Sequence, residues 1–379
     1  MTNIKEILVS VLFVGILILP FTDRLFGFFP EVKNNENRSL KAKPHLNVSY
    51  LDAFPAEFDE YYSDNFDLRN QFLLLNSKLK FQMFNMPPID DKAILGLDDW
   101  MYLVEDQMET YLGKTLINNS SLNQYYNIIN YRRNFLDSIG SKYYIVVVPV
   151  KTSVYPEFLP VFRQKNDQKT LTDQFVNLTD TMRGLTVVDL RPVFKEAKGG
   201  GVRMFHKTDN HWNEYGSYIA YKEIMKVISN DFPGLDPMDI SGFTIDSVEV
   251  EGMGLSKMMG IYLGVTENKI SCKPTFQSKS KKGQISNYPI TPSFGYKSQY
   301  EMVYVVDNES LPKLLMIRDS FGGTVMPFLS EHFSKSIYIW DGWQYGLNKN
   351  IVLNEKPDIY IQIVVETFIP NILEYAKYP

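Results

Sequence analysis

Uninterrupted apolar runs of strand length recur along the chain and alternate with helical segments. Tyr143–Val148 (YYIVVV) is the clearest run, because none of its side chains is charged. A strand that is apolar on both faces is typical of a parallel sheet buried between two layers of helices. Strands are predicted at residues 143–148, 185–190, 314–317, 336–340 and 358–365, with helices at residues 122–139, 171–182, 213–228 and 324–333. The chain is therefore predicted to be an α/β protein with a parallel sheet flanked by helices.

Two segments depart from this alternation. Ile94–Leu103 has the pattern of a β-hairpin, with Asp98 and Asp99 at its turn. Residues 242–311 combine short β-rich pieces at 243–250 and 300–306 with a lysine-rich stretch at 277–283. We interpret residues 242–311 as a β-rich insertion in the α/β domain, and the lysine-rich stretch as a solvated loop.

The N-terminus carries a separate signal. Ile7–Phe21 contains no charged residue, and Ile4 with Leu25–Phe29 extends the apolar stretch towards the length of a membrane span. No small-x-small cleavage motif follows it, which favours an uncleaved anchor over a cleaved signal peptide. The flanking charges support an orientation only weakly. We predict a signal anchor at residues 1–29, a polar, Asn-rich stalk at residues 30–60 and a catalytic domain at residues 61–379.

Charge and cysteine content narrow the classes of function. The net charge is −5, and acidic and basic residues are interspersed without a basic block. This distribution does not favour binding to nucleic acid. Cys272 is the single cysteine, so no disulfide can form within the chain. A large extracytoplasmic domain does not need a disulfide, so this count leaves the compartment open.

The segment His206–Gly216 concentrates chemistry in few residues. It holds two of the four histidines in the chain, and Asp209 and His211 stand two residues apart. In an extended segment or a tight turn, side chains at this spacing leave the backbone on the same side. A carboxylate beside an imidazole sets its tautomer and stabilises the imidazolium ion. We therefore predict that His211 is a general base oriented by Asp209.

Ser320 is the candidate group for this base to activate. It follows the apolar run that begins at Lys313 and precedes a Gly-Gly pair, at a predicted strand-to-helix turn. Such a turn exposes the hydroxyl, and the backbone N–H groups of Ser320 and Gly322 are candidates for an oxyanion hole. Ser320 alone would be interpreted as a helix cap. Together with Asp209 and His211, it indicates a Ser–His–Asp site.

Other interpretations of these residues remain open. His206, Asp209 and His211 could form a metal site, but no further His or Cys cluster completes a ligand shell, so we predict neither a metal nor a cofactor. Asn213 is a candidate helix cap. Trp212 is a candidate core residue as well as a candidate substrate platform. Asp319 receives no role.

Two segments carry a family resemblance. Thr208–Gly216, followed downstream by Arg318–Gly322, resembles the SGNH-hydrolase-like alginate O-acetyltransferases, which are extracytoplasmic proteins that acetylate bacterial exopolysaccharides. This family places Asp-x-His-Trp before its serine, as this chain does. Shorter matches are Asn37–Leu40, Asp64–Arg69, Asp99–Tyr102, Val148–Pro156 and Gly254–Gly260. Gly254 stands where the family often has Asp, and the usual Pro after Trp212 is missing.

The resemblance implies an SGNH-like, flavodoxin-like fold and a set of roles. Ser320 would be the nucleophile, His211 the base and Asp209 its orienting group. Lys151 and Tyr155 match positions near the active-site face, and with Trp212 they are candidate substrate-binding residues. The resemblance also implies an extracytoplasmic catalytic domain, a polysaccharide acceptor, and a membrane-bound O-acyltransferase as the donor partner.

The expected reaction is acyl transfer through an ester on Ser320 to a hydroxyl of a bacterial exopolysaccharide or cell-wall glycan. A carbohydrate acetylesterase would use the same residues with water as acceptor. A third hypothesis is an inactive glycan-binding or scaffold protein that keeps the fold. The three hypotheses share one fold and differ in the fate of the acetyl group.

Overall fold

The computed structural model describes residues 4–32, 39–46, 52–84, 92–163, 168–259, 265–286, 288 and 300–374. Two compact units make up the chain: residues 1–90 with residues 252–265, and residues 91–251 with residues 266–379. The α/β unit thus begins 30 residues after the predicted start of the catalytic domain at residue 61. The functional limits of anchor, stalk and catalytic domain stay predictions. Residues 1–3, 33–38, 47–51 and 260, on which parts of the anchor, the stalk and the shorter family matches fall, lie outside the described residues.

The first unit is helical in its described part. Its helices are α1 (Ile4–Phe26), α2 (Phe54–Asn65), α3 (Arg69–Phe84) and α10 (Gly254–Met258). No residue of α1 is buried. Within the described residues, α1 is the one helix long and apolar enough to cross a membrane, judged by length and composition. The predicted apolar N-terminal helix is confirmed, and it fits a membrane anchor.

The second unit is built on a seven-stranded sheet in the order β4-β3-β11-β9-β10-β8-β7. Strands β4, β3, β11, β9 and β10 run parallel to their neighbours. The parallel strands are β3 (Lys142–Val148), β4 (Leu185–Asp189), β9 (Lys313–Arg318), β10 (Lys335–Trp340) and β11 (Ile359–Val365). All five lie at the predicted positions, so the predicted α/β class is confirmed.

Two features of the sheet differ from the expectation. The predicted strand at residues 300–306 is β8 (Glu301–Val305), which pairs antiparallel with β10, and β7 (Lys281–Lys282) continues the sheet beyond it. These strands therefore belong to the main sheet, which is mixed, and not to a separate insertion. β11, the last of the described strands, lies beside β3, so the strand order also departs from that of flavodoxin. The part of the predicted insertion that forms its own ribbon is β5 (Phe243–Glu251) paired with β6 (Thr266–Pro274).

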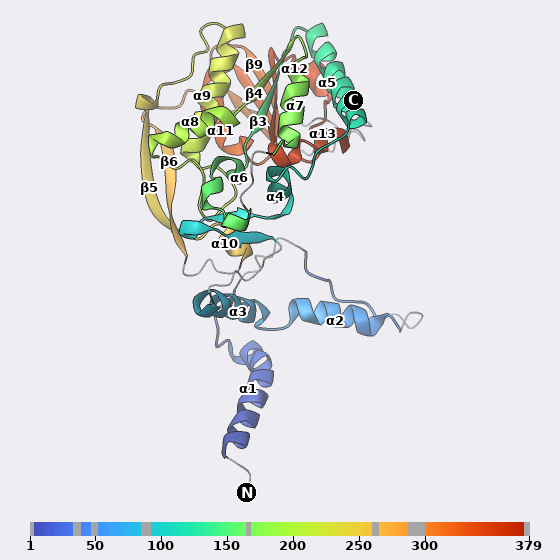
Figure 1. Ribbon diagram of the computed structural model, residues 1–379, viewed down its shortest axis with the longest axis vertical. Helices are drawn as coiled ribbons and strands as arrows, with labels where there is room; N and C mark the ends of the chain where they lie inside the picture. Colours follow the sequence, from blue (N-terminus) through green and yellow to red (C-terminus); the bar gives the residue numbers. More distant parts are fainter. Residues whose placement is uncertain are drawn as a thin grey trace. The chain divides into compact units, whose positions relative to one another are not determined.

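Helices cover both faces of the sheet (Figure 1). One apolar cluster packs α8 (Arg191–Ala197), α9 (Glu214–Asp231) and α11 (Gly322–Leu329) against the sheet. A second cluster holds α5 (Asn119–Ser138), α7 (Leu171–Thr179), α12 (Lys349–Glu355) and α13 (Asn371–Glu374) on the opposite face. The central strands β3, β11, β9 and β10 are buried between the two clusters, as expected for continuous apolar runs. Shorter elements are α4 (Glu105–Tyr111) and α6 (Lys151–Val154).

The predicted hairpin at Ile94–Leu103 is confirmed. β1 (Ala93–Leu95) and β2 (Met101–Leu103) pair antiparallel through a turn in which Asp98 and Asp99 have positive φ. Asp tolerates this conformation better than most residues. The hairpin contacts the loop that carries His211: the Met101 N–H donates to the Lys207 carbonyl at 2.9 Å, and Lys207 Nζ donates to the Asp98 carbonyl at 2.7 Å.

Candidate active site

The loop that carries Asp209 and His211 is closed at its base by backbone hydrogen bonds. Phe205 and Trp212 form an antiparallel bridge, and the Asn213 N–H donates to the Met204 carbonyl at 2.8 Å. Asn213 also caps α9, because its side chain accepts from the Gly216 N–H at 3.0 Å. The predicted helix cap is confirmed. Residues 206–211 therefore project as a loop between a bridge and a capped helix.

Three predicted residues meet at this loop. His211 Nδ1 lies 2.7 Å from Asp209 Oδ1, and His211 Nε2 lies 2.8 Å from Ser320 Oγ. The Asp209 carboxylate also accepts from the His211 backbone N–H at 3.0 Å, which fixes the side chain against its own turn. With Nδ1–H donated to Asp209, Nε2 is left to accept the serine proton. This arrangement matches the geometry of a nucleophile, a base and an orienting acid.

Ser320 lies between β9 and α11, at the carboxyl end of a central strand. The preceding residue, Asp319, is fully buried and organises the turn. Its carboxylate accepts from the Phe321 N–H at 2.9 Å, from the Val365 N–H at 2.7 Å and from the Tyr345 hydroxyl at 2.8 Å. Burial raises the pKa of Asp319, although these hydrogen bonds oppose the rise. Asp319 therefore connects the end of β9 to the end of β11 and holds the Ser320 turn in place.

The predicted oxyanion donors have different fates. In the described part of the chain, the Ser320 N–H donates to no acceptor, so it stays a candidate donor. The Gly322 N–H, in contrast, faces the Asp319 carboxylate and stabilises its charged form. The expectation that Gly322 is an oxyanion donor is corrected, because the buried Asp319 carboxylate accepts from the Phe321 and Gly322 N–H groups at the start of α11.

Gly322 has a packing role at the same turn. A Cβ atom at Gly322 would lie 2.7 Å from Arg318 Cβ and 3.0 Å from Ile363 Cγ2. Such distances are shorter than van der Waals contact, so a larger residue would push the turn away from β9 and β11. A Cβ atom at Gly323 would meet its nearest neighbour, Arg318 Nη1, at 3.7 Å, which is ordinary contact. Only the first glycine of the pair is required by packing.

Glu267 on β6 supports the loop from the side of the ribbon. Its carboxylate accepts from the Thr208 N–H at 2.6 Å and from the Thr208 hydroxyl, and it lies 3.2 Å from His206 Nδ1 and 3.1 Å from Arg203 Nη2. Burial alone would raise the pKa of Glu267, but the hydrogen bonds from His206 and Thr208 outweigh it and lower the pKa to about 2. Glu267 is thus an anionic anchor for the loop.

These contacts also bear on the alternative of a metal site. His206 faces Glu267, whereas His211 faces Ser320, so the two imidazoles serve different partners. The described residues contain no group of three or more His, Cys, Asp or Glu side chains placed to hold a metal ion. In place of a shared metal ion, His206 contacts the buried Glu267 carboxylate and His211 contacts Ser320.

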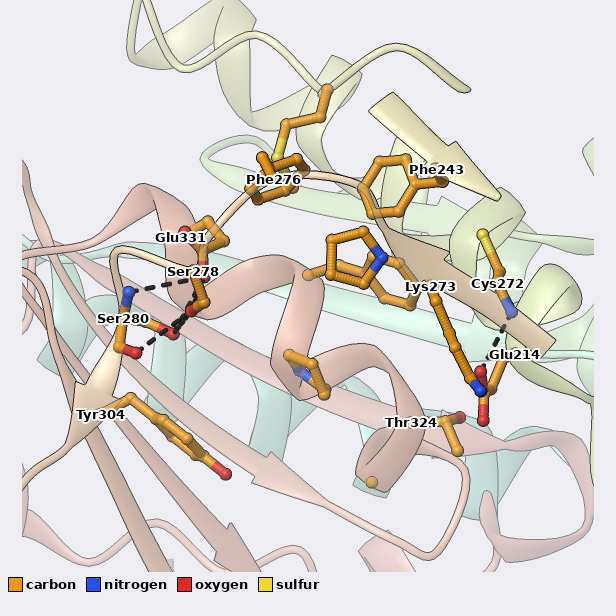
Figure 2. Close-up of a pocket in the computed structure, with 15 residues that line it drawn as sticks. Glu214, Phe243, Cys272, Lys273, Phe276, Ser278, Ser280, Tyr304, Thr324 and Glu331 are labelled. Atoms are coloured by element: carbon orange, nitrogen blue, oxygen red, sulfur yellow. Dashed lines mark hydrogen bonds between the residues drawn. The ribbon is translucent and has the colours of Figure 1, made fainter. Parts of the chain in front are cut away.

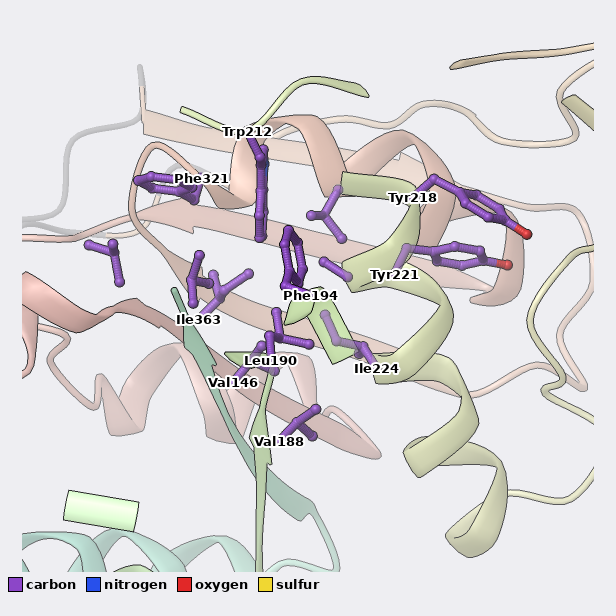
Figure 3. Packing of buried hydrophobic residues seen from close by; sticks show 14 of the residues in the cluster. Val146, Val188, Leu190, Phe194, Trp212, Tyr218, Tyr221, Ile224, Phe321 and Ile363 are labelled. Atoms are coloured by element: carbon purple, nitrogen blue, oxygen red, sulfur yellow. The ribbon is translucent and has the colours of Figure 1, made fainter. Parts of the chain in front are cut away.

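The candidate substrate-binding residues lie beneath the site. Trp212 packs between Phe194 and Phe321 in the core, and its Nε1–H donates to Thr324 Oγ1 at 2.7 Å (Figure 3). Tyr155 is 5% exposed, and its hydroxyl accepts from the Met204 N–H at 3.1 Å. The expectation that Trp212 and Tyr155 contact a glycan is corrected. Because both side chains are buried, they support the loop and the helix instead.

Lys151 is buried as well, at the carboxyl end of β3. Its Nζ lies within hydrogen-bonding distance of three backbone carbonyls of the loop that carries Asp209. It lies over the rings of Trp100 and Tyr102, at 5.7 and 5.4 Å from their centroids. Lys151 is fully buried, so it contacts the protein and not a bound glycan. Its expected role in binding substrate is corrected on the same physical ground.

A pocket of about 500 Å³ lies along α11 (Figure 2). The rings of Phe243, Phe276 and Tyr304 line its wall, and Lys273 of β6 lines it as well. Glu214 and Thr324 line the same pocket and follow His211 and Ser320 by three and four residues. Because an α-helix rises about 6 Å over four residues, the pocket begins close to the Ser320 turn.

Asp209, His211 and Ser320 were predicted from the sequence, but the residues that support them were not. Glu267 carries no motif and lies 56 residues beyond His211, so no local signal points to it. Asp319 adjoins Ser320, and its place between a buried strand and a turn was a usable signal, since a carboxylate there must find donors.

Comparison with known proteins addresses the family. The family model of the SGNH hydrolase-like domain, acetyltransferase AlgX, matches residues 93–266, which include Asp209 and His211. A probable alginate O-acetylase AlgJ of Pseudomonas syringae pv. tomato is 26% identical over 237 residues, covering 62% of this chain and 55% of the relative. Over residues 93–266 the chain is similar to the SGNH hydrolase-like alginate O-acetyltransferase family. A second probable alginate O-acetylase AlgJ, of Pseudomonas fluorescens, is 25% identical over 46% of this chain and 42% of the relative. The chain thus spans about half the length of these relatives.

Solved structures support the fold of this chain. Bacillus cereus PatB1 with a sulfonyl adduct is similar with a TM-score of 0.53 and 17% identity, over 74% of this chain and 99% of that one. A DHHW family protein from Eubacterium siraeum is similar with a TM-score of 0.50 and 15% identity, over 66% of this chain and 87% of that one. At these identities the likeness concerns the SGNH-like fold and not the reaction.

Proposed function

We propose that this protein transfers acetyl groups to hydroxyls of a bacterial exopolysaccharide or cell-wall glycan through an ester on Ser320. The observation that supports the proposal is the hydrogen-bonded series Asp209–His211–Ser320, with both contacts under 3 Å. Similarity to proteins named probable alginate O-acetylases favours acetyl transfer to a polysaccharide.

In the first half-reaction, Ser320 Oγ attacks the carbonyl carbon of an acetyl donor while its proton passes to His211 Nε2. The leaving group of the donor takes that proton as the bond to the carbonyl breaks. Asp209 stabilises the imidazolium ion that exists between the two transfers. The Ser320 N–H is the candidate backbone donor to the tetrahedral oxyanion. The product is an acetyl ester on Ser320.

In the second half-reaction, a sugar hydroxyl gives its proton to His211 Nε2 and attacks the ester. The proton then returns to Ser320 Oγ as that oxygen leaves. Water in place of the sugar would release acetate, so the acceptor decides between transferase and esterase. The acceptor must therefore reach the ester faster than water does.

The pocket along α11 is the acceptor site in this proposal. It borders both segments that carry the reacting residues, and its aromatic walls offer faces on which the C–H face of a sugar packs. Phe276 is 36% exposed there. Phe276→Ala should raise KM for an oligosaccharide acceptor and leave the turnover of a small acetyl ester unchanged. Tyr126→Ala, which removes an exposed ring from α5, serves as the matched control.

The donor side involves the membrane in this proposal. The apolar helix α1 would hold the protein at a membrane with its catalytic domain on the extracytoplasmic side. A membrane-bound O-acyltransferase would supply the acetyl group, as the family resemblance implies. Deletion of the gene for such a partner should abolish acetylation of the glycan in cells while the purified protein still turns over a soluble acetyl ester.

The test compares acetate release and sugar acetylation from a small activated acetyl ester. The wild-type protein should divert acetyl from water to an added oligosaccharide, and Ser320→Ala should abolish both products. Acetate release that no sugar changes would favour the esterase. Unchanged turnover in Ser320→Ala would refute both enzymatic functions at this site and leave the glycan-binding protein.

A further inference from the structure

The loop that carries Asp209 and His211 is held from below by one ammonium group. Lys151 Nζ donates to the carbonyl oxygens of His206 at 2.8 Å, of Lys207 at 3.1 Å and of Asp209 at 2.5 Å. These carbonyls belong to the stretch that leads directly into His211. Lys151 itself lies at the start of α6, which follows the buried strand β3, so its backbone is fixed by the sheet.

The number of carbonyl oxygens around Lys151 Nζ indicates the protonation state of this group. An ammonium group has three N–H donors, and three carbonyl oxygens surround this nitrogen. A neutral amine has two donors and one lone pair, which would point at the third carbonyl oxygen. Deprotonation therefore replaces one hydrogen bond of the loop with a repulsive contact. The loop geometry seen here belongs to the charged form of Lys151.

The surroundings of Lys151 place its titration in an accessible range. Burial lowers the pKa of Lys151 to about 7, the carboxylates of Asp209 and Glu267 oppose the decrease, and the guanidinium of Arg203 adds to it. The Tyr102 ring faces the ammonium group without a charge of its own, because burial raises the pKa of its phenol well above the usual value. Lys151 thus loses its proton far more readily than an exposed lysine.

We propose that Lys151 is the positioning residue of this active site, whose ammonium form holds the 206–209 loop so that His211 reaches Ser320. The inference rests on the proposed function, because it concerns the same reacting residues. Lys151 touches neither reacting atom and acts through Asp209 and His211. Loss of the Lys151 proton as pH rises loosens the contact between Asp209 and His211 and slows acetyl transfer. The activity therefore falls at high pH because of this lysine.

The decisive variant is Lys151→Met in the full chain, which keeps the length of the side chain and removes its donors. We expect kcat for a small acetyl ester to fall about 100-fold, as for a misplaced catalytic group, with KM little changed. The falling limb of the wild-type pH–kcat profile, centred near pH 7, should be absent from the variant. A lysine with only a structural role would leave the shape of the profile unchanged.

Lys198→Met is the matched control. Lys198 also donates to a backbone carbonyl, that of Val154 at 3.1 Å, and lies over the Tyr155 ring at 5.2 Å, but it does not contact the loop. This variant should keep both the kcat and the alkaline limb of the wild type. An equal loss in both variants would overturn the proposal, since general loss of charge near Tyr155 would then explain it.

A spectroscopic measurement separates this inference from the proposed function. The proton between His211 Nδ1 and Asp209 Oδ1, held at 2.7 Å, should give a far-downfield proton NMR signal. The signal should disappear in folded Lys151→Met and persist in Lys198→Met, whether or not the protein turns over any ester. Absence of turnover in the wild type with this signal pattern would refute the proposed function alone.

The wild-type protein provides the same test if Lys151→Met does not fold. The signal reports the contact between His211 Nδ1 and Asp209 Oδ1 directly. Loss of the signal as pH rises through the Lys151 pKa, at about 7, supports the proposal. A signal that stays unchanged well above that pH, or a folded Lys151→Met protein with wild-type kcat and alkaline limb, overturns it.

Discussion

His211 Nε2 lies 2.8 Å from Ser320 Oγ although 109 residues separate the two in the chain. The sheet brings them together, because β9 delivers Ser320 to the carboxyl edge of the parallel strands. The loop with His211 reaches the same edge through three supports: Lys151 after β3, the Glu267 carboxylate on β6 and the hairpin β1–β2. A contact of 2.8 Å between residues so far apart depends on each of these supports.

Within the reacting group, we expect unequal losses. Ser320→Ala and His211→Ala should each reduce kcat by about 10⁶-fold, and Asp209→Asn by about 10⁴-fold, because the last change mis-sets the tautomer without removing the base. The double variant Ser320→Ala/His211→Ala should lose little more than either single one, since the members act as a unit. Steady-state kinetics with a small acetyl ester measures this. Losses that multiply in the double variant would contradict a shared role.

The two glycines after Phe321 should behave differently. Gly322→Ala should destabilise the fold by about 1–3 kcal/mol, because its Cβ atom would lie 2.7 Å from Arg318 Cβ. Gly323→Ala should be tolerated, because its Cβ atom meets its nearest neighbour at 3.7 Å. Urea unfolding of both variants provides the comparison, with Gly323→Ala as the matched control. Equal stability of the two variants would show that the turn accommodates a Cβ atom at Gly322, against this prediction.

Glu267 should make stability depend on acid. Its folded pKa of about 2 lies below the usual value of 4.5, so folding favours its charged form. This contribution, about 3 kcal/mol, is fully present above pH 4.5 and is lost as pH falls towards 2. In Glu267→Gln, Tm should be lower at neutral pH and should vary less across this window than in the wild type. Glu249→Gln, on the exposed side of the paired strand β5, should keep the wild-type dependence.

The N-terminal helix predicts a membrane-associated protein. Residues 1–30 should be retained in the protein purified from cells, and the protein should partition with membranes until detergent is added, because α1 exposes an apolar surface along its whole length. N-terminal sequencing and membrane fractionation measure these properties. A mature N-terminus beyond residue 20 would replace the anchor with a cleaved signal peptide.

The sequence predicted those features that depend on neighbouring residues in the chain: strand positions, a helix cap and a hairpin turn. The strands β3, β4, β9, β10 and β11 lie at the predicted positions. For β3, β9, β10 and β11 the reason is that a strand buried on both faces is largely apolar. Asn213 caps α9 and Asp98–Asp99 turn the β1–β2 hairpin through contacts with their own neighbours in the chain. Asp209, His211 and Ser320, which the structure brings together, were predicted from residue type and spacing, and their role in acyl transfer stays a prediction.

The tertiary structure decided what depends on residues far apart in the chain. The pairing of β8 with β10 and the place of β11 beside β3 are choices among many apolar partners, and periodicity does not distinguish them. The roles of Lys151, Glu267 and Gly322 likewise came from the fold. No local sequence pattern shows that Lys151 is buried, because the three carbonyls that surround its Nζ belong to a distant segment. The sequence determined which side chains can carry the chemistry, because that depends on their functional groups. Their arrangement depends on how buried charges and amides find partners, and only the folded chain provides those partners.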